Sequence, residues 1–263
     1  MNKLKILHIG WMPKEGKEKI YEPLQKYARP DVEVYHIDLD PNKAPFTHTW
    51  RYYYYMKLCT FAILDRVHYA EVNGYDAVLL DCFGDPALRE AREIVRIPVI
   101  GPGESSMHIA CMLGHSFSIL VNCRNSYTDA INDAKTYGVF DKVKSVRWVD
   151  LASIEMLKNQ EKARKRILEE AKKAVEEDGA EVVVSGCTTH HLIFEEVGGP
   201  QFVQDEIGVP YVDPSIVSLK MAEIMAELYR NIGLSHSKVG RYFFEDAQNF
   251  LKRNFIFKFM EPV

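Results

Sequence analysis

The stretch GYDAVLLDC (residues 74–82) recurs in altered form as GAEVVVSGC (residues 179–187), and this repeat decides the fold. Each copy has a glycine, an acidic residue two positions later, an apolar run and a final cysteine, and the copies match at an offset of 105 (179 − 74). A short apolar run bounded by turn residues is typical of a buried strand. The repeat therefore predicts two equivalent strands that end at Cys82 and Cys187.

The repeat continues downstream of both cysteines. IPVIGP (residues 97–102) matches VPYVDP (residues 209–214) at an offset of 112 (209 − 97), and an insertion around residues 198–200 accounts for the difference of seven. Strand patterns alternate with helical ones along the chain, which indicates a parallel sheet covered on both faces and a doubly wound α/β fold. The expected strands are residues 4–9, 32–37, 77–81, 99–100, 117–121, 144–149, 182–185 and 211–212.

Two long helical patterns stand between these strands. Residues 154–177 have apolar residues at helical spacing among mixed charges, and we expect one helix with a solvated face. Residues 50–67 (WRYYYYMKLCTFAILDRV) form a second, aromatic pattern, which we interpret as a core or subunit-contact helix.

A chain built of two similar α/β units usually packs them about a pseudo-twofold axis, so that equivalent residues face each other across a cleft. We therefore predict one lobe from residues 1–100 with 217–263 and a second lobe from residues 101–216, with the active site in the cleft between them.

Composition excludes several classes of function. The formal charge of −4 gives no electrostatic reason to expect nucleic acid or an anionic membrane as partner. The sequence has neither a complete dinucleotide fingerprint nor a phosphate-binding loop. His190 and His191 follow Cys187 closely, but no second cluster at zinc-ligand spacing accompanies them. We expect a small-molecule substrate, with no cofactor, metal, nucleic acid or membrane.

The five cysteines are scattered and odd in number, which favours free thiols in a reducing compartment. Residues 1–12 have the pattern of a first strand rather than of an export signal. We expect the protein to be cytoplasmic.

The cysteine pair suggests a specific chemistry. Ligands of open parallel sheets bind at the carboxyl ends of the strands, where loops lead into helix N-termini. Racemisation without a cofactor needs one group that removes a proton from one face of a carbon and a second that delivers a proton to the other face. Cys82 and Cys187 at equivalent strand ends meet this need, one ionised and one protonated, and are the predicted catalytic residues.

Such a reaction also needs donors that stabilise the enolate oxygen. The candidates are the backbone N–H groups of Phe83, Gly84 and Thr188, together with the hydroxyls of Thr188 and Thr189. Asn122 and Cys123 follow the expected strand 117–121 and complete the predicted substrate-binding set at this edge.

The segments DCFGDP (residues 81–86), IPVIGPGESSMH (residues 97–108) and SGCTT (residues 185–189) resemble the aspartate/glutamate/hydantoin racemase superfamily, most closely its hydantoin and allantoin racemase branch. The resemblance implies two Rossmann-like lobes, cofactor-free proton transfer at a ring carbon next to a carbonyl, and a homo-oligomer. It matches Cys82 and Cys187 to the two catalytic cysteines of the family. The family's first strand commonly ends in a substrate-contacting Asn-Pro-Asn-Thr run, and Trp11, which occupies that region here, is also a predicted substrate-binding residue.

Two other functions remain open. A decarboxylase or a cis–trans isomerase of the same superfamily would use the same cleft, although cysteines on both walls favour stereochemical inversion. A two-lobed ligand-binding protein without catalysis is the alternative from another class, but binding alone gives no reason for two matched thiols.

Overall fold

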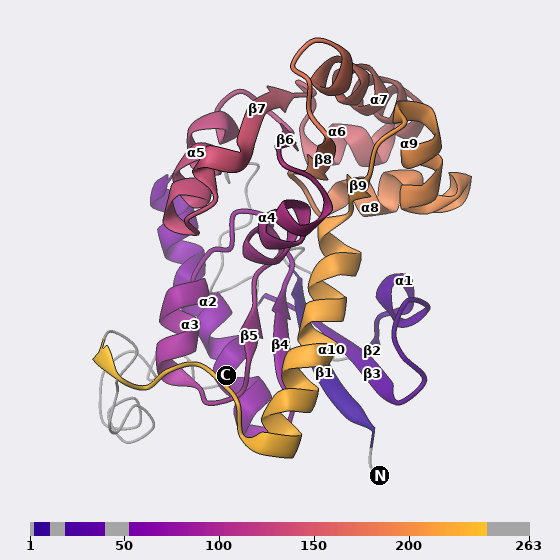
Figure 1. Cartoon of the computed structure of the whole chain (residues 1–263). Helices are drawn as coiled ribbons and strands as arrows, with labels where there is room; N and C mark the ends of the chain where they lie inside the picture. The colour runs from indigo at the N-terminus through magenta and orange to yellow at the C-terminus, as the bar shows by residue number, and fades with distance from the viewer. Residues whose placement is uncertain (1–2, 11–18, 40–52, 241–263) are drawn as a thin grey trace. The chain divides into compact units, whose positions relative to one another are not determined.

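The computed structural model describes residues 3–10, 19–39 and 53–240, and its contacts divide them into two compact units (Figure 1). Unit 1 comprises the described residues up to Leu80, then Pro86–Ile100 and the residues from Lys220 on, whereas unit 2 comprises Asp81–Asp85 and Gly101–Leu219. The lobe boundaries predicted from the sequence and the pseudo-twofold relation stay predictions.

Unit 1 is built on a sheet with the strand order β2-β3-β1-β4-β5. All neighbouring strands are parallel except β2, which pairs antiparallel with β3. Helix α2 packs on β1 and β4, and α3 packs on β5 (Figure 1). The elements are β1 (Leu4–Gly10), β2 (Lys19–Ile20), α1 (Glu22–Gln25), β3 (Val32–Asp38), α2 (Tyr53–Val72), β4 (Ala77–Leu80), α3 (Leu88–Ile94) and β5 (Val99–Ile100), with α10 (Pro214–Ile232) joining the unit from Lys220.

Unit 2 is built on a fully parallel sheet with the order β7-β6-β8-β9. Its strands are β6 (Phe117–Val121), β7 (Val143–Trp148), β8 (Val182–Ser185) and β9 (Tyr211–Val212). Its helices are α4 (Pro102–Leu113), α5 (Ser126–Thr136), η1 (Phe140–Lys142), α6 (Ser153–Lys158), α7 (Gln160–Glu176), α8 (Thr189–Phe194), η2 (Glu195–Val197) and α9 (Gly199–Ile207).

The repeat in the sequence is a repeat of structure. The orders β3-β1-β4-β5 and β7-β6-β8-β9 are the same topology. Val78 pairs with Val99 in one sheet, and Val183 pairs with Tyr211 in the other, which are the offsets of 105 and 112 found in the sequence. The predicted α/β class with two parallel sheets is confirmed, and all eight expected strands are present.

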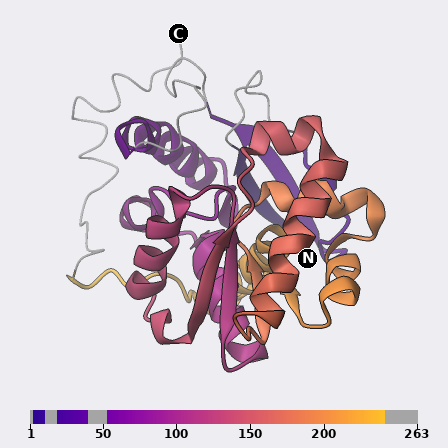
Figure 2. The same ribbon diagram turned by 90° about the horizontal axis from the view of Figure 1, so that it is seen from above.

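Helices cover both faces of the sheet in unit 2, with α5 on one side and α7 on the other (Figure 2). Successive residues of a strand point to opposite faces, so Ile119 and Val121 pack with α4 and α5, whereas Leu120 packs with α7. The buried apolar residues of α7 recur at helical spacing and are Ala163, Ile167, Ala171 and Ala174.

The sequence pattern over residues 154–177 predicted one helix, and this prediction was wrong in one respect. The segment forms α6 and α7, which are separated at Asn159 (φ −141°, ψ 78°). The Asn159 side chain accepts a hydrogen bond of 3.1 Å from the backbone N–H of Lys162 and so caps α7. None of the described helices is long and apolar enough to cross a membrane.

Unit 1 buries a polar pair within its sheet. His8 of β1 and His36 of β3 are register partners whose Nδ1 atoms lie 2.8 Å apart, and Nε2 of His36 lies 3.1 Å from Oδ1 of Asp38. Tyr21 stacks on both rings at centroid distances of 4.7 and 4.6 Å. A Cβ at Gly10 would lie only 2.3 Å from Cε1 of His36, so the histidine requires a glycine at this position.

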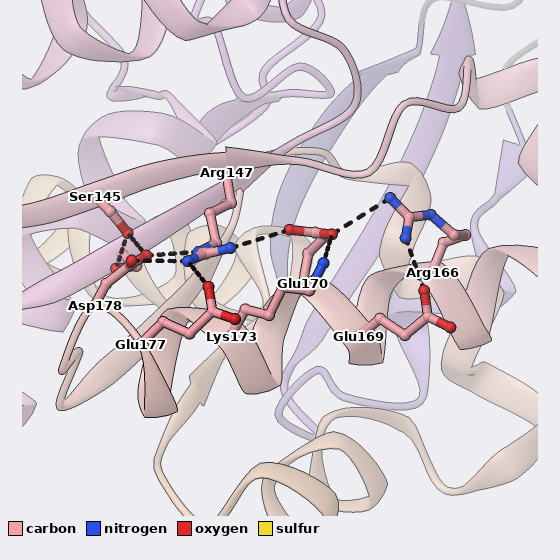
Figure 3. A network of polar contacts seen from close by, with 9 residues as sticks. Ser145, Arg147, Arg166, Glu169, Glu170, Lys173, Glu177 and Asp178 are labelled. Carbon is pink, nitrogen blue, oxygen red and sulfur yellow. Dashed lines mark hydrogen bonds and ion pairs between the residues drawn. The ribbon is translucent and has the colours of Figure 1, made fainter.

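A cluster of ion pairs fixes the edge strand β7 to α7 and the turn after it (Figure 3). Nε and Nη2 of Arg147 donate to the two carboxylate oxygens of Asp178 at 2.6 and 2.7 Å, and Nη2 also donates to Glu177 at 2.7 Å. Nη1 lies 3.4 Å from a carboxylate oxygen of Glu170. The hydrogen bond from Arg147 is the main cause that lowers the pKa of Asp178.

We expect Arg147→Met to lower the free energy of unfolding by about 2 kcal/mol, because it leaves the mostly buried carboxylate of Asp178 without two charged hydrogen bonds. The matched control is Arg166→Met, which removes a more exposed guanidinium (34% of the side chain against 18%) and should cost less than about 1 kcal/mol. Urea unfolding at neutral pH, followed by circular dichroism, measures both. Equal losses would show that Arg147 is no more than a surface charge.

Candidate functional site

The two cysteines predicted to be catalytic follow equivalent strands. Cys82 comes two residues after the end of β4, and Cys187 comes two residues after the end of β8. Both side chains are half-buried, all five cysteines are free, and both Cys82 and Cys187 belong to unit 2 by their contacts. Since β4 and β8 lie in parallel sheets, each thiol is at a carboxyl-terminal strand edge, where such sheets bind ligands.

Asp85 anchors the loop that carries Cys82. Its carboxylate accepts hydrogen bonds from the N–H groups of Gly103 (2.9 Å) and Glu104 (2.7 Å) at the start of α4, and from the Tyr137 hydroxyl (2.7 Å). Its own N–H donates to the carbonyl of Cys82 at 3.0 Å and closes a turn. Asp85 has a positive φ of 44°, a conformation that is costly for a residue other than glycine and that these hydrogen bonds hold in place.

Two glycines make this close approach possible. A Cβ at Gly103 would lie 2.1 Å from the carbonyl oxygen of Phe83, and a Cβ at Gly101 would lie 2.5 Å from Cγ of Asp85. Side chains at either position would displace the Cys82 loop from α4.

Burial raises the pKa of Asp85 to about 7, although its three hydrogen bonds act in the opposite direction. Burial also raises the pKa of the Cys82 thiol well above its ordinary value. A hydrogen bond from the Gly84 backbone opposes this shift, and negative charge on Cys187 and Asp85 adds to it. Cys82 is therefore held as a neutral thiol, and the two cysteines are close enough to interact electrostatically.

Cys187 has a different environment, which is rich in donors. Nδ2 of Asn122 lies 3.1 Å from the Cys187 sulfur, the backbone N–H of Thr189 donates to it at 3.4 Å, and the Ser153 hydroxyl lies 3.8 Å away. Donors that point at a sulfur atom stabilise its thiolate form.

A buried histidine, His190, contacts the side chain of Asn122. Nε2 of His190 lies 3.0 Å from Oδ1 of Asn122, and Nδ1 of His190 lies 2.8 Å from the Ser185 hydroxyl. His190 is 1% exposed, and burial lowers its pKa to about 4, so its imidazole is neutral at physiological pH.

The structure gives the remaining predicted substrate-binding residues different surroundings. Phe83 is buried, and its side chain packs in the hydrophobic core of unit 2. Gly84 is exposed, and Thr188 and Thr189 are half-buried where α8 begins. Cys123 is half-buried, with its sulfur 3.5 Å from the Ser126 hydroxyl. Trp11 lies outside the described residues.

His191, the neighbour of His190, does not join it in a metal site. Its Nδ1 lies 2.9 Å from Asp213, whose other carboxylate oxygen accepts the N–H groups of Ser215 and Ile216 at the start of α10. Within the part of the chain that the structure describes, no group of three or more His, Cys, Asp or Glu side chains is placed to hold a metal ion.

Sequence reasoning missed Asp85, Ser153 and the role of His190. One signal could have found two of them, because the offset of 105 that aligns the cysteines also aligns Asp85 with His190 (190 − 85). Each half thus has a buried polar residue three positions after its cysteine. Ser153 has no equivalent signal in the sequence.

Comparisons with known proteins agree on one family. Residues 10–222 match the family model described as Asp/Glu/Hydantoin racemase. The chain is 27% identical over 227 residues to a hydantoin racemase from Pseudomonas sp. (strain NS671), covering 85% of this chain and 84% of that one. It is 31% identical over 189 residues to a hydantoin racemase from Paenarthrobacter aurescens, covering 70% and 75%. Among solved structures, an allantoin racemase from Klebsiella pneumoniae superposes with a TM-score of 0.78 at 24% identity, over 92% of this chain and 94% of that one.

We expect Gly103→Ala to lower the free energy of unfolding by about 1–3 kcal/mol, because the new Cβ meets the backbone of Phe83 and not a flexible side chain. Gly84→Ala is the control, since a Cβ there meets nothing within 4 Å. Urea unfolding of both variants measures the difference. A Gly103→Ala variant as stable as the control would contradict the described packing of the loop on α4.

The neutral state of His190 predicts a loss of stability in acid. Its pKa is lowered on folding, so its contribution is present above about pH 6.5 and is lost as the pH falls towards about 4. Between pH 7.5 and pH 5 this one group should cost about 2 kcal/mol of unfolding free energy. The glutamine of His190→Gln cannot be protonated. The unfolding free energy of this variant should therefore fall by about 2 kcal/mol less than that of the wild type over the same pH range. Parallel pH dependence of the two proteins in urea unfolding would refute the assignment.

Proposed function

The chain belongs to the Asp/Glu/hydantoin racemase family and is an isomerase of the racemase type, and from this premise we propose a two-base mechanism in which Cys82 and Cys187 invert a carbon next to a carbonyl. The supporting observation is the pair of half-buried thiols at equivalent strand ends, which are close enough to interact electrostatically.

Each turnover moves two protons. A cysteine thiolate removes the proton from the substrate carbon, so that a C–H bond breaks, an S–H bond forms and the electron pair moves into the carbonyl as an enolate. The other cysteine, a thiol, then gives its proton to the opposite face, and the carbonyl re-forms. The enzyme ends with the two thiols in exchanged protonation states, ready for the enantiomer.

A hydantoin-like ring is the proposed substrate class. Hydantoin and allantoin, the compounds in the relatives' names, share a five-membered ring whose carbon 5 carries a hydrogen next to a carbonyl. The enolate of such a ring is planar, so both faces are equivalent for protonation. Backbone N–H groups near the cysteines, such as that of Thr188 where α8 begins, are suited to stabilise the enolate oxygen.

We expect the wild-type protein to racemise single enantiomers of 5-substituted hydantoins or of allantoin and, in D2O, to exchange the hydrogen on carbon 5. Cys82→Ser and Cys187→Ser should each lower the rate of racemisation at least about 100-fold, because a serine hydroxyl is a much poorer acid and base at neutral pH. Chiral chromatography measures inversion, and proton NMR measures exchange.

Cys111→Ser is the matched control, since this half-buried thiol of α4 has no part in the proposed mechanism and its loss should leave the rate unchanged. The two-cysteine mechanism fails if either Cys82→Ser or Cys187→Ser racemises at the wild-type rate. Release of CO2 from a carboxylated substrate without inversion would identify a decarboxylase instead.

A further inference from the structure

We propose that Cys187 is the resting thiolate and Cys82 the resting thiol, and that Asn122, oriented by the buried His190, is the positioning residue that fixes this order. The inference rests on the proposed two-cysteine mechanism and assigns the starting role of each thiol. It also gives Asn122 a different role from the substrate contact expected from the sequence.

The amide of Asn122 has a complete set of hydrogen-bond partners when Cys187 is a thiolate. Its Nδ2 carries two hydrogens and lies 3.1 Å from the Cys187 sulfur and 2.9 Å from the Ser153 hydroxyl. Its Oδ1 must then accept, and the neighbouring donor is Nε2–H of His190 at 3.0 Å. A hydrogen bond that an amide donates to sulfur is stronger when the sulfur is a charged thiolate than when it is a neutral thiol, so this contact favours the thiolate.

The histidine behind the amide is neutral and fits the same order. With its proton on Nε2, His190 has a lone pair on Nδ1, which accepts from the Ser185 hydroxyl at 2.8 Å. Because burial holds the pKa of His190 near 4, it cannot donate from both nitrogens at neutral pH. Hydrogen bonds are thus donated from Ser185 to His190, from His190 to Asn122, and from Asn122 to the sulfur of Cys187.

A Cys187 thiol that donates to Asn122 would require every hydrogen bond of this chain to reverse its direction. If Cys187 were a thiol donating to this amide, Oδ1 would have to face the sulfur and Nδ2 would have to face His190. His190 would then need the other tautomer, and the Ser185 hydroxyl would turn to the backbone carbonyl of Cys187, 3.0 Å away. In that arrangement the backbone N–H of Thr189 would still point at the sulfur, at 3.4 Å, and it favours the thiolate.

Cys82 has the opposite surroundings. Burial is the main cause that disfavours the Cys82 thiolate, and negative charge on Asp85 and Asp81 adds to it, whereas a hydrogen bond from the Gly84 backbone opposes it. Within the described residues, no side chain donates a hydrogen bond to its sulfur. The position three residues after the cysteine holds the carboxyl group of Asp85 in one half and the neutral imidazole of His190 in the other.

The other titratable groups around the pair agree with this order. Tyr211 interacts with Cys187, and burial raises its pKa, so it stays a neutral phenol. Asp213 interacts with His190 without overcoming the effect of burial. The two thiols interact with each other, so ionisation of Cys187 makes ionisation of Cys82 harder. Ionisation of both thiols at the same time is therefore disfavoured.

The test is the pH dependence of alkylation of the whole protein by iodoacetamide, which reacts with thiolates. Peptide mass spectrometry follows the alkylation of Cys82 and of Cys187 separately, from about pH 5 upward. We expect the Cys187 midpoint to lie at least about one pH unit below that of Cys82. A Cys82 midpoint equal to or below that of Cys187 overturns the inference.

Three variants separate positioning from a general structural effect. Asn122→Ala should raise the Cys187 midpoint by about one pH unit, because it removes a hydrogen bond to the charged sulfur. His190→Leu should raise it as well, whereas His190→Gln, whose amide can still donate to Asn122, should restore most of the wild-type value. Asn125→Ala, an exposed residue of the same loop, is the control and should leave both midpoints unchanged. An unchanged Cys187 midpoint in folded Asn122→Ala overturns the positioning role.

Failure of this inference differs from failure of the proposed function. If the wild-type protein and both cysteine-to-serine variants give the same result in the racemisation assay, the proposed function fails whatever the midpoints are. If racemisation needs both cysteines but Cys82 titrates first, only the assignment of roles fails.

Discussion

The hydrogen bonds around the Asp85 carboxylate are the constraint on which the site depends. They hold the loop after β4 against the N-terminus of α4, so that Cys82 belongs by its contacts to the unit that also carries Cys187. The N-terminus of α4 donates two N–H groups to the carboxylate. These hydrogen bonds hold Asp85 in a left-handed conformation. Burial is the main cause that raises the pKa of the neighbouring Cys82 thiol, and negative charge on Asp85 adds to it. Asp85 thus positions Cys82 and contributes to its low acidity.

Much of the fold could be predicted from the sequence, because the apolar runs are short, buried and repeated. All eight strands of the repeat follow from that pattern, whereas β2 (Lys19–Ile20) does not, since two residues carry no periodicity. The separation of α6 from α7 depends on the backbone of Asn159, which helical spacing does not report. Both cysteines could be identified from the repeat. The contacts of Ser153 with Cys187 and of Tyr137 with Asp85 could not, because each pair is far apart in the chain and comes close only in the folded unit.

The two halves have kept their topology and have diverged in chemistry. The register partners His8 and His36 of unit 1 correspond to the apolar pair Ile119 and Val146 of unit 2. The residues three positions after each cysteine, Asp85 and His190, differ in the same way. The two halves carry thiols at equivalent strand ends, and the different residues at these neighbouring positions make their environments unequal. In the proposed two-cysteine mechanism, one cysteine is ionised and the other is protonated at the start of each turnover.

The strand β7 forms one edge of the sheet in unit 2, and an open edge is a template on which another chain can add a strand. Lys144 is exposed on this strand. Arg147, on the same strand, forms ion pairs with carboxylates of α7 and of the following turn. A foreign strand that approached the edge would have to bring its own backbone next to these charges and displace their water. Charged side chains on an edge strand are one of the features that disfavour pairing with the sheet edge of another molecule, and β7 carries such charges.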